Sequence, residues 1–425
     1  MKPQDSASRA DMVRFNPAIR RRKSRISSFN PRHHGYFNPK RLNDVFISVV
    51  AEGIISFLAV TDLIALQGVC RSLREAVKSR LDHRYNINIF LKDFLQDPGT
   101  FRHQLGRADA LIVRGPALNF LESQHRQFEY LDLLVEDGDK ARSLIDYLCT
   151  EESYFEWDFI PISSQPGRSA DQSELTTILR RGSGEELLES AIRVRRTSTF
   201  PIHALLENCC MTAELNFVTC NKAFSLFPAA TLAKHKTYPL RPMDDEFGTL
   251  LRELSCQGWT TRDMLSLALG AQPPYKSGPR RVGDTRSVCV SLAPHIDSAG
   301  CTPDYVIEHA AFDVSVKMEQ SSKKGPLQIH WSEEMALHVR KLDSPSLYYQ
   351  FTVGIFQSWS YFVNKRLEHW TRIEMFKIPR TSRSFSVTSR GFLPEIRGTQ
   401  RPPDWDYADD QIPAWYEVYR QTSLR

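Results

Sequence analysis

The chain has 425 residues, 41% of them hydrophobic and 25% charged, which is enough for two or three domains with cores of their own. No apolar run approaches the roughly 20 residues of a membrane span, and no apolar segment follows the first basic residues, so we expect neither a membrane protein nor a secreted one. The eight cysteines are scattered without paired C-x-x-C motifs, so we expect reduced thiols in an intracellular protein, with no metal site and no cofactor.

Residues 1–41 carry most of the positive charge. They hold eleven Lys and Arg against two Asp, a net charge of +9, whereas the whole chain is +5. With Ser, Asn, Pro and Gly and no apolar periodicity, this tail is predicted to be disordered. Its cluster Arg20–Arg25 could serve nuclear import or contact nucleic acid weakly, or it could be a solvated tail with no reader. We therefore expect a cytoplasmic or nuclear protein.

Residues 42–81 are predicted to form helices. Asp44–Leu58 is almost continuously apolar, and Thr61–Leu81 shows helical spacing with Thr61 or Asp62 as the N-cap. One apolar stripe recurs at three and four residues along the second segment: Leu63, Leu66, Val69, Cys70, Leu73 and Val77.

The stretch IISFLAVTDLIALQGVCRSLREAV resembles the F-box. The residues that carry the match are Ile55, Phe57, Leu58, Asp62, Leu63, Leu66, Val69, Cys70 and Arg71. The resemblance implies docking of the small adaptor subunit of cullin-based ubiquitin ligases, with Leu58, Leu63, Leu66, Val69 and Cys70 as partner-binding residues. Two positions depart from the family: Leu42-Asn43 replaces Leu-Pro, and Leu73 replaces a late Trp. The alternative is an ordinary helical hairpin packed on the next domain.

Ala110–Gly138 has the layout of a metal-dependent transferase site with one half missing. A short apolar run meets Gly115, a helix-sized interval follows, and the apolar strand Leu131–Val135 contains Asp132. This layout resembles the opening of a nucleotidyltransferase-type domain, in which two carboxylates one residue apart share a strand face and hold divalent metals. The corresponding pair here is Tyr130 and Asp132.

A second resemblance connects both segments. YNINIFLKDFLQDPGTFRHQLGRADALIVRGPALNFLE, FEYLDLLVEDG and MTAELNFVTCNKAFSLFP look like a group of filamentous-fungal proteins that join an F-box-like hairpin to a nucleotidyltransferase-like domain. The likeness spans about Leu42–Leu240. It implies a fold more firmly than a function.

The chemistry of such a site is altered at each element. The phosphate-holding turn reads Arg114-Gly115-Pro116, and a proline supplies neither N–H nor hydroxyl. Glu129 would face away from Asp132 on a regular strand unless a bulge turned it. The strand expected to carry the third acid, Ile192–Arg196, carries arginines. Gly115 and Asp132 are therefore vestigial candidates, with no catalytic residue and no metal ligand set predicted.

The second half is less informative. Residues 246–269 are predicted to form two helices, and residues 287–292 and 306–316 two strands. Tyr348–Phe376 is dense in aromatics interleaved with Lys365, Arg366 and Arg372, which could stack nucleic-acid bases or form a core. Pro402–Tyr419 is an aromatic and acidic stretch that could be a docking peptide or a strap over the domain.

These observations predict an α+β protein. Its expected parts are a disordered tail (1–41), F-box-like helices (42–81), a degenerate nucleotidyltransferase-like mixed-sheet domain (82–245) and a C-terminal helical and strand extension (246–425). The expected function is that of a non-catalytic interaction scaffold, a pseudoenzyme that acts as a substrate adaptor of a cullin-type ubiquitin ligase. The alternative is a divergent metal-dependent nucleotidyltransferase using Asp132, and a third reading is a nucleic-acid binder acting through the basic tail.

Overall fold

The computed structural model divides the chain into two compact units, Met1–Val49 and Val50–Arg425. It describes residue 58 and residues 60–123, 128–161, 175–181, 190–241, 245–261, 277–293, 300–322, 329–356, 358–379, 384–388, 391–395 and 401–423, all of them in the second unit. The predicted basic tail, Ile55 and Phe57 lie outside the described residues.

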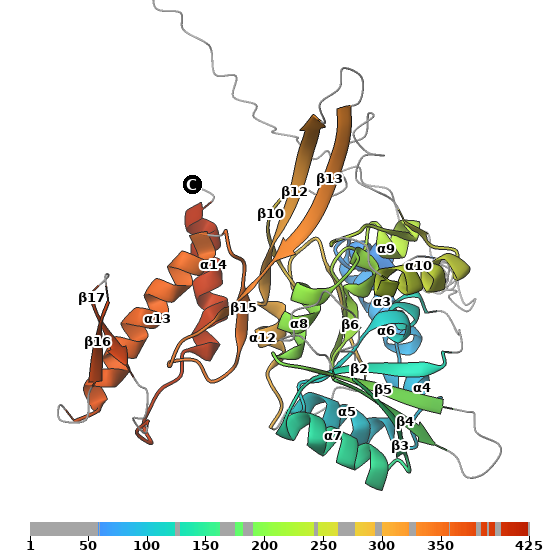
Figure 1. Cartoon of the computed structure of the whole chain (residues 1–425), viewed down its shortest axis with the longest axis horizontal. Helices are drawn as coiled ribbons and strands as arrows, with labels where there is room; N and C mark the ends of the chain where they lie inside the picture. The colour runs from blue at the N-terminus through green and yellow to red at the C-terminus, as the bar shows by residue number, and fades with distance from the viewer. Residues whose placement is uncertain are drawn as a thin grey trace, which may run out of the picture. The chain divides into compact units, whose positions relative to one another are not determined.

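A mixed sheet forms the centre of the described part (Figure 1). Its eight strands run in the order β11-β7-β6-β1-β2-β5-β4-β3, with β2 and β5 parallel and the other neighbours antiparallel. Their bounds are β1 Leu111–Ile112, β2 Tyr130–Glu136, β3 Phe155–Pro161, β4 Leu175–Arg181, β5 Ser190–Thr197, β6 Asn216–Val218, β7 Lys222–Ser225 and β11 Val288–Ser291.

Strand β2 is buried on both faces of the sheet. Its side chains alternate between the two faces, so they enter two different core clusters. Leu133 and Val135 join one core cluster with residues of α5 (Pro98–Arg107) and α7 (Asp139–Thr150). Leu134 joins the opposite cluster with Ile202 and other residues of α8 (Pro201–Asn208). Figure 1 shows α5 and α7 together along one face of the sheet. A run of five buried residues in β2 is the sequence signature of such a central strand.

The predicted helix over residues 61–81 is broken. It forms α2 (Val60–Gln67) and α3 (Arg71–Arg84), with a tight turn in which the amides of Gly68 and Val69 bond to the carbonyls of Ala65 and Leu66. The break resets the helical phase, so the predicted apolar stripe does not continue across it.

The N-terminal helices share the core of the sheet. Leu63 and Val77 are fully buried, and α2 contacts both β11 and the short helix α9 (Thr231–Lys234). Between them and β1 lie α4 (Ile87–Leu91) and α5, whose first amides are capped by the side chains of Asn86 and Asp97. Helix α6 (Arg114–Glu122) follows β1 directly.

Small elements complete the region between α8 and β11. They are the 3-10 turn Thr212–Glu214, β8 (Lys236–Thr237), α10 (Asp245–Cys256), β9 (Thr260–Thr261) and β10 (Gly278–Arg281). The predicted strand 287–292 is confirmed as β11, and α10 is the first of the two helices expected over 246–269. The second of those helices falls mostly outside the described residues.

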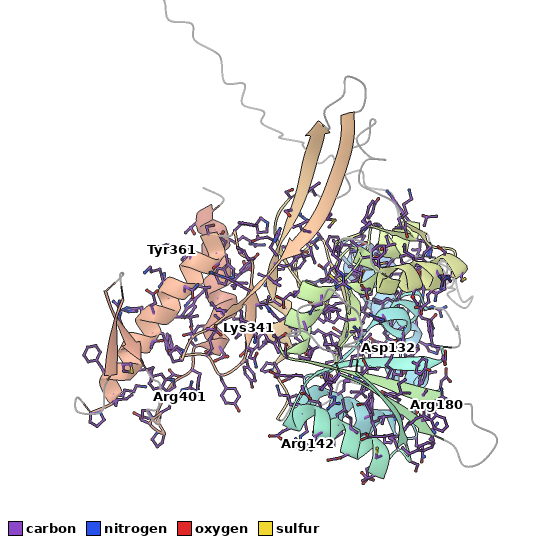
Figure 2. The ribbon with its side chains drawn as sticks, in the orientation of Figure 1. Asp132, Arg142, Arg180, Lys341, Tyr361 and Arg401 are labelled. Atoms are coloured by element: carbon purple, nitrogen blue, oxygen red, sulfur yellow. The ribbon has the colours of Figure 1, made fainter. Side chains whose placement is uncertain are left out.

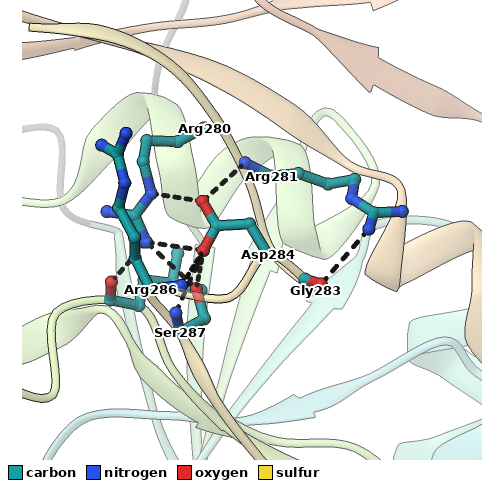
Figure 3. A network of polar contacts seen from close by, with 7 residues as sticks. Arg280, Arg281, Gly283, Asp284, Arg286 and Ser287 are labelled. Carbon is teal, nitrogen blue, oxygen red and sulfur yellow. Dashed lines mark hydrogen bonds and ion pairs between the residues drawn. The ribbon is translucent and has the colours of Figure 1, made fainter. Parts of the chain in front are cut away.

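An arginine–aspartate clasp organises the turn between β10 and β11 (Figure 3). Arg280 is 5% exposed and donates to Asp284 from Nε at 2.5 Å and from Nη2 at 3.1 Å. Asp284 also accepts from the amides of Arg286 and Ser287 at 2.9 and 3.0 Å. Burial alone would raise the pKa of Asp284, but the hydrogen bonds and charge of Arg280 outweigh it and the pKa is lowered.

The C-terminal part has its own core. Its elements are α12 (Asp304–Glu308), the hairpin β12 (Ala311–Ser322) and β13 (Ile329–His338), the pair β14 (Arg340–Leu342) and β15 (Phe351–Val353), α13 (Ser358–Lys377), the hairpin β16 (Ser384–Thr388) and β17 (Gly391–Glu395), the 3-10 turn Asp409–Gln411 and α14 (Ile412–Ser423). Trp359, Val363 and Leu367 of α13 form the core with Phe351 and Ile412.

Residues 402–411 are a strap along α13. Trp405 is 6% exposed and packs with Met375 and Ile378. The indole Nε1 of Trp370 donates to the Asp406 carbonyl at 3.0 Å, and the Asp406 amide donates to Glu374 at 2.9 Å. The first part of the stretch Pro402–Tyr419 is therefore a strap, and the rest of it belongs to helix α14.

The predicted α+β class is confirmed at this level: the described residues combine helices with a large mixed sheet. Among these residues, no helix combines the length and the hydropathy of a membrane span.

Candidate functional site

The candidate site is centred on Asp132 in the middle of β2. The parallel register of β2 and β5 sets Asp132 opposite Arg193, and the Asp132 side chain is 4% exposed. Arg193 donates from Nε to Oδ1 at 2.5 Å and from Nη2 to Oδ2 at 2.9 Å. This is the two-pronged geometry in which a guanidinium matches a carboxylate. Both carboxylate oxygens of Asp132 are therefore engaged by one cation.

Tyr130 occupies the position at which the family resemblance expects a second carboxylate. The guanidinium of Arg193 lies over its ring, 4.9 Å from the centroid. Burial and the neighbouring Glu129 raise the pKa of Tyr130, so the phenol stays protonated at neutral pH. Burial alone would lower the pKa of Arg193, but Asp132 outweighs it and the pKa is raised. The centre of the site is thus a closed ion pair beside a neutral ring.

The turn after β1 is also filled. An ideal Cβ on Gly115 would lie 2.7 Å from Cε1 of Phe128, so the aromatic ring covers the glycine. Arg114 adopts φ of +60°, a conformation that L-residues rarely take, and its Nε lies 3.5 Å from Oε1 of Glu214. Glu214 is buried and accepts from the Cys210 amide at 2.6 Å. The space over the turn therefore belongs to the protein's own side chains.

Few metal-ligating side chains lie around Asp132 in the described part of the chain. Among the described residues, no three His, Cys, Asp or Glu side chains gather as a metal site. Glu129 is exposed and precedes β2. A divalent cation at Asp132 would have to displace Arg193 from a nearly buried carboxylate.

The segment that the resemblance implied would carry a third acid is a strand next to Asp132. Residues 192–196 fall within β5, directly beside β2. The sequence pattern did not reveal that Arg193 pairs with Asp132, because that contact depends on the register of the two parallel strands. Phe128 and Glu214 were also missed, and no local pattern around either residue indicates its contact.

A nucleophile and base pair formed by His203 and Cys209 is not supported. His203 is stacked on Phe200 and hydrogen-bonds through Nδ1 to Thr352 Oγ1 at 3.3 Å. The Cys209 thiol donates to the Leu206 carbonyl, and burial raises its pKa well above the usual range. Each residue is engaged in separate packing.

The five expected partner-binding residues are not equivalent in the structure. Leu63 is fully buried in the core, so it cannot contact a partner with α2 in this position. Leu58 and Leu66 are partly buried against the same core. Val69, at 67% exposure, and Cys70 lie on the surface at the turn between α2 and α3. The helix break at Gly68 causes this difference.

Comparison with models of protein families, with curated proteins and with solved structures gave no match.

Proposed function

We propose that the protein is a non-catalytic interaction scaffold built on a degenerate nucleotidyltransferase-like domain. The observation that carries this proposal is the engagement of both Asp132 oxygens by Arg193. A carboxylate held in this way has its charge compensated, so a metal would have to compete with the guanidinium for its oxygens. The Phe128 ring over Gly115 supports the same conclusion, because a triphosphate at that turn would meet carbon instead of backbone amides.

Nucleotide transfer is the test of the catalytic half of the proposal. The purified chain is incubated with labelled nucleoside triphosphates, an oligonucleotide acceptor and Mg²⁺ or Mn²⁺. We expect no transfer above the level of an Asp132→Ala variant. Transfer that Asp132→Ala abolishes while thermal unfolding shows the variant to be folded would overturn the proposal and favour the divergent nucleotidyltransferase.

We further propose that the α2–α3 turn docks the adaptor subunit of a cullin-type ubiquitin ligase, as the F-box resemblance implies. The protein would then be cytoplasmic or nuclear. The support is the exposure of Val69 and Cys70 at the turn of a hairpin that Leu63 and Val77 anchor in the core. In this proposal Leu63 and Val77 pack the hairpin against the sheet, and the turn contacts the adaptor.

Binding to the purified adaptor tests this part. Val69→Asp introduces a charge at an exposed position, so it should leave the fold intact and lower adaptor affinity at least tenfold. Ile89→Asp is the matched control, since Ile89 is 55% exposed on α4. Equal binding by both variants, or no binding by the unchanged protein, would remove the adaptor from the proposal.

A further inference from the structure

Exposed apolar side chains gather in the C-terminal part. Of eleven exposed large hydrophobic residues in the described part of the chain, seven lie between residues 348 and 418. They are Tyr348, Ile355, Phe356, Tyr361, Ile373, Phe376 and Val418. Soluble surfaces rarely concentrate such side chains without a use for them.

Helix α13 has two different faces. Its inner face carries Trp359, Val363 and Leu367, all buried in the C-terminal core. Its outer face carries Tyr361 at 66% exposure and Phe376 at 71%. At the helical rise these two rings stand about 22 Å apart along one exposed face. The sequence pattern left open whether the aromatics of this segment form core or surface, and the structure divides them between both.

Residues 358–401 are rich in basic side chains, with nine Lys and Arg against three Glu and no Asp. The strap of residues 402–411 that lies along α13 carries four Asp, so the basic character belongs to the helix segment and not to the whole C-terminal part. Two of the cations on α13 are compensated: Lys365 pairs with Glu368 at 2.9 Å and Lys377 with Glu374 at 2.7 Å.

Arg366 and Arg372 are the uncompensated cations of the helix. Both are exposed. Arg366 lies over the Phe362 ring at 5.3 Å, and within the described residues neither arginine has a carboxylate within ion-pair distance. The outer face of α13 therefore combines exposed rings with unpaired guanidinium groups.

We propose that the outer face of α13, defined by Tyr361, Arg366, Arg372, Ile373 and Phe376, binds single-stranded nucleic acid. Tyr361 and Phe376 supply flat surfaces on which unpaired bases stack, and the two arginines meet the phosphates. This binding is sequence-tolerant, because every base has a π-face and every nucleotide a phosphate. The proposal is independent of both the adaptor and the fate of the Asp132 site, and it does not use the basic tail.

The binding test uses the full chain and a fluorescent 20-nucleotide oligouridylate, followed by anisotropy between 50 and 250 mM salt. With two phosphates neutralised by the two arginines, log Kobs should fall against log salt with a slope of about −1.4. Arg366→Glu with Arg372→Glu should lower the affinity at least tenfold and flatten the slope. Tyr361→Ala with Phe376→Ala should lower the affinity comparably and leave the slope unchanged.

Arg142 provides the matched control. It is 71% exposed on α7, where it pairs with Asp139, and Figure 2 labels it on a different helix from Tyr361. Arg142→Glu should bind as the unchanged protein does. A full-length variant with Gln at the five basic positions of residues 20–25 measures the share of the tail, and thermal unfolding confirms that each variant is folded.

Three outcomes would overturn the proposal. The first is no binding at 50 mM salt. The second is binding that the tail variant abolishes and the α13 variants leave unchanged. The third is displacement of the oligouridylate by polyglutamate of equal charge at equal concentration, which would make the face a site for an acidic polypeptide. If the double arginine variant fails to fold, the aromatic variant still decides between these outcomes.

Discussion

Arg193 reaches Asp132 from 61 residues further along the chain and closes around both of its carboxylate oxygens. The contact joins the centres of two parallel strands, and it compensates the charge of a nearly buried carboxylate inside the sheet.

Removing one member of this pair should be costly. Arg193→Leu leaves a nearly buried carboxylate without a partner, and we expect a loss of about 3–5 kcal/mol in the free energy of unfolding. The double variant Asp132→Leu with Arg193→Leu removes both charges and should recover more than half of that loss. Urea unfolding measures both. A loss below about 1 kcal/mol for Arg193→Leu, typical of exposed ion pairs, would contradict a structural role.

Gly115 should not tolerate a methyl group. The backbone of Gly115 is not in the left-handed region, so Gly115→Ala tests only the contact with Phe128. We expect a destabilisation of about 1–3 kcal/mol from overpacking, measured by urea unfolding. Phe128→Leu in the same background should relieve part of it. If Gly115→Ala proves neutral, the turn is open and the argument against phosphate binding there weakens.

Asp284 should make the protein sensitive to acid. Its pKa is lower in the folded state than the ordinary value of 3.8, so the folded state binds the proton less readily. The stabilisation is therefore complete above that value and is lost as the pH falls through the folded-state pKa.

Asp284→Asn is the corresponding variant. At neutral pH it leaves the buried Arg280 without its anion, and we expect a loss of about 3–5 kcal/mol. The difference in unfolding free energy between the two proteins should narrow below pH 4, because protonation of Asp284 in the unchanged protein removes the charge that the variant lacks. Chemical unfolding at pH 7, 5 and 3.5 measures this. A pH-independent difference would show that the clasp does not act through charge.

A second effect of pH on stability is expected from His203, in a different pH range. Burial lowers the pKa of His203 below the ordinary 6.5, so the folded state disfavours the charged ring. Its contribution is complete above pH 6.5 and is lost as the pH falls through the folded-state pKa.

The variant His203→Gln keeps a polar contact to Thr352 and cannot titrate. Between pH 7.5 and 5.5 its unfolding free energy should decline less than that of the unchanged protein. Burial likewise lowers the pKa of His309. The variant His309→Gln therefore measures how much of the pH dependence of the unfolding free energy comes from that second histidine. Equal slopes for His203→Gln and the unchanged protein would assign the effect elsewhere.

Local patterns predicted several elements of this fold. The apolar run after Tyr130 became a central strand, and the stretch around Arg193 became its parallel neighbour. Strand β11 also lies within the predicted strand over residues 287–292. These patterns report burial directly, since a strand buried on both faces is apolar throughout and a half-buried one alternates.

Other predictions failed where a local signal competed with periodicity. The strand expected over residues 306–316 begins only at Ala311, because Pro303 and Asp304 start the short helix α12 first. The helix expected over residues 61–81 breaks at Gly68, which moved Val69 and Cys70 from the predicted buried stripe to the surface. Contacts such as Gly115 with Phe128 depend on tertiary packing and have no counterpart in sequence spacing.

The position of β11 also determines which fragments of the chain contain a complete sheet and when the sheet can form during translation. Strand β11 is the edge strand that covers β7, pairing with it from Val288↔Ser225 to Ser291↔Lys222. An expression fragment that stops at residue 245 would leave β7 as an unpaired edge and invite chain-to-chain association. On the ribosome, the same edge stays open until residue 291 has been synthesised and has emerged. A usable fragment of the sheet therefore has to extend at least to Leu292, whose amide bonds to the Asn221 carbonyl.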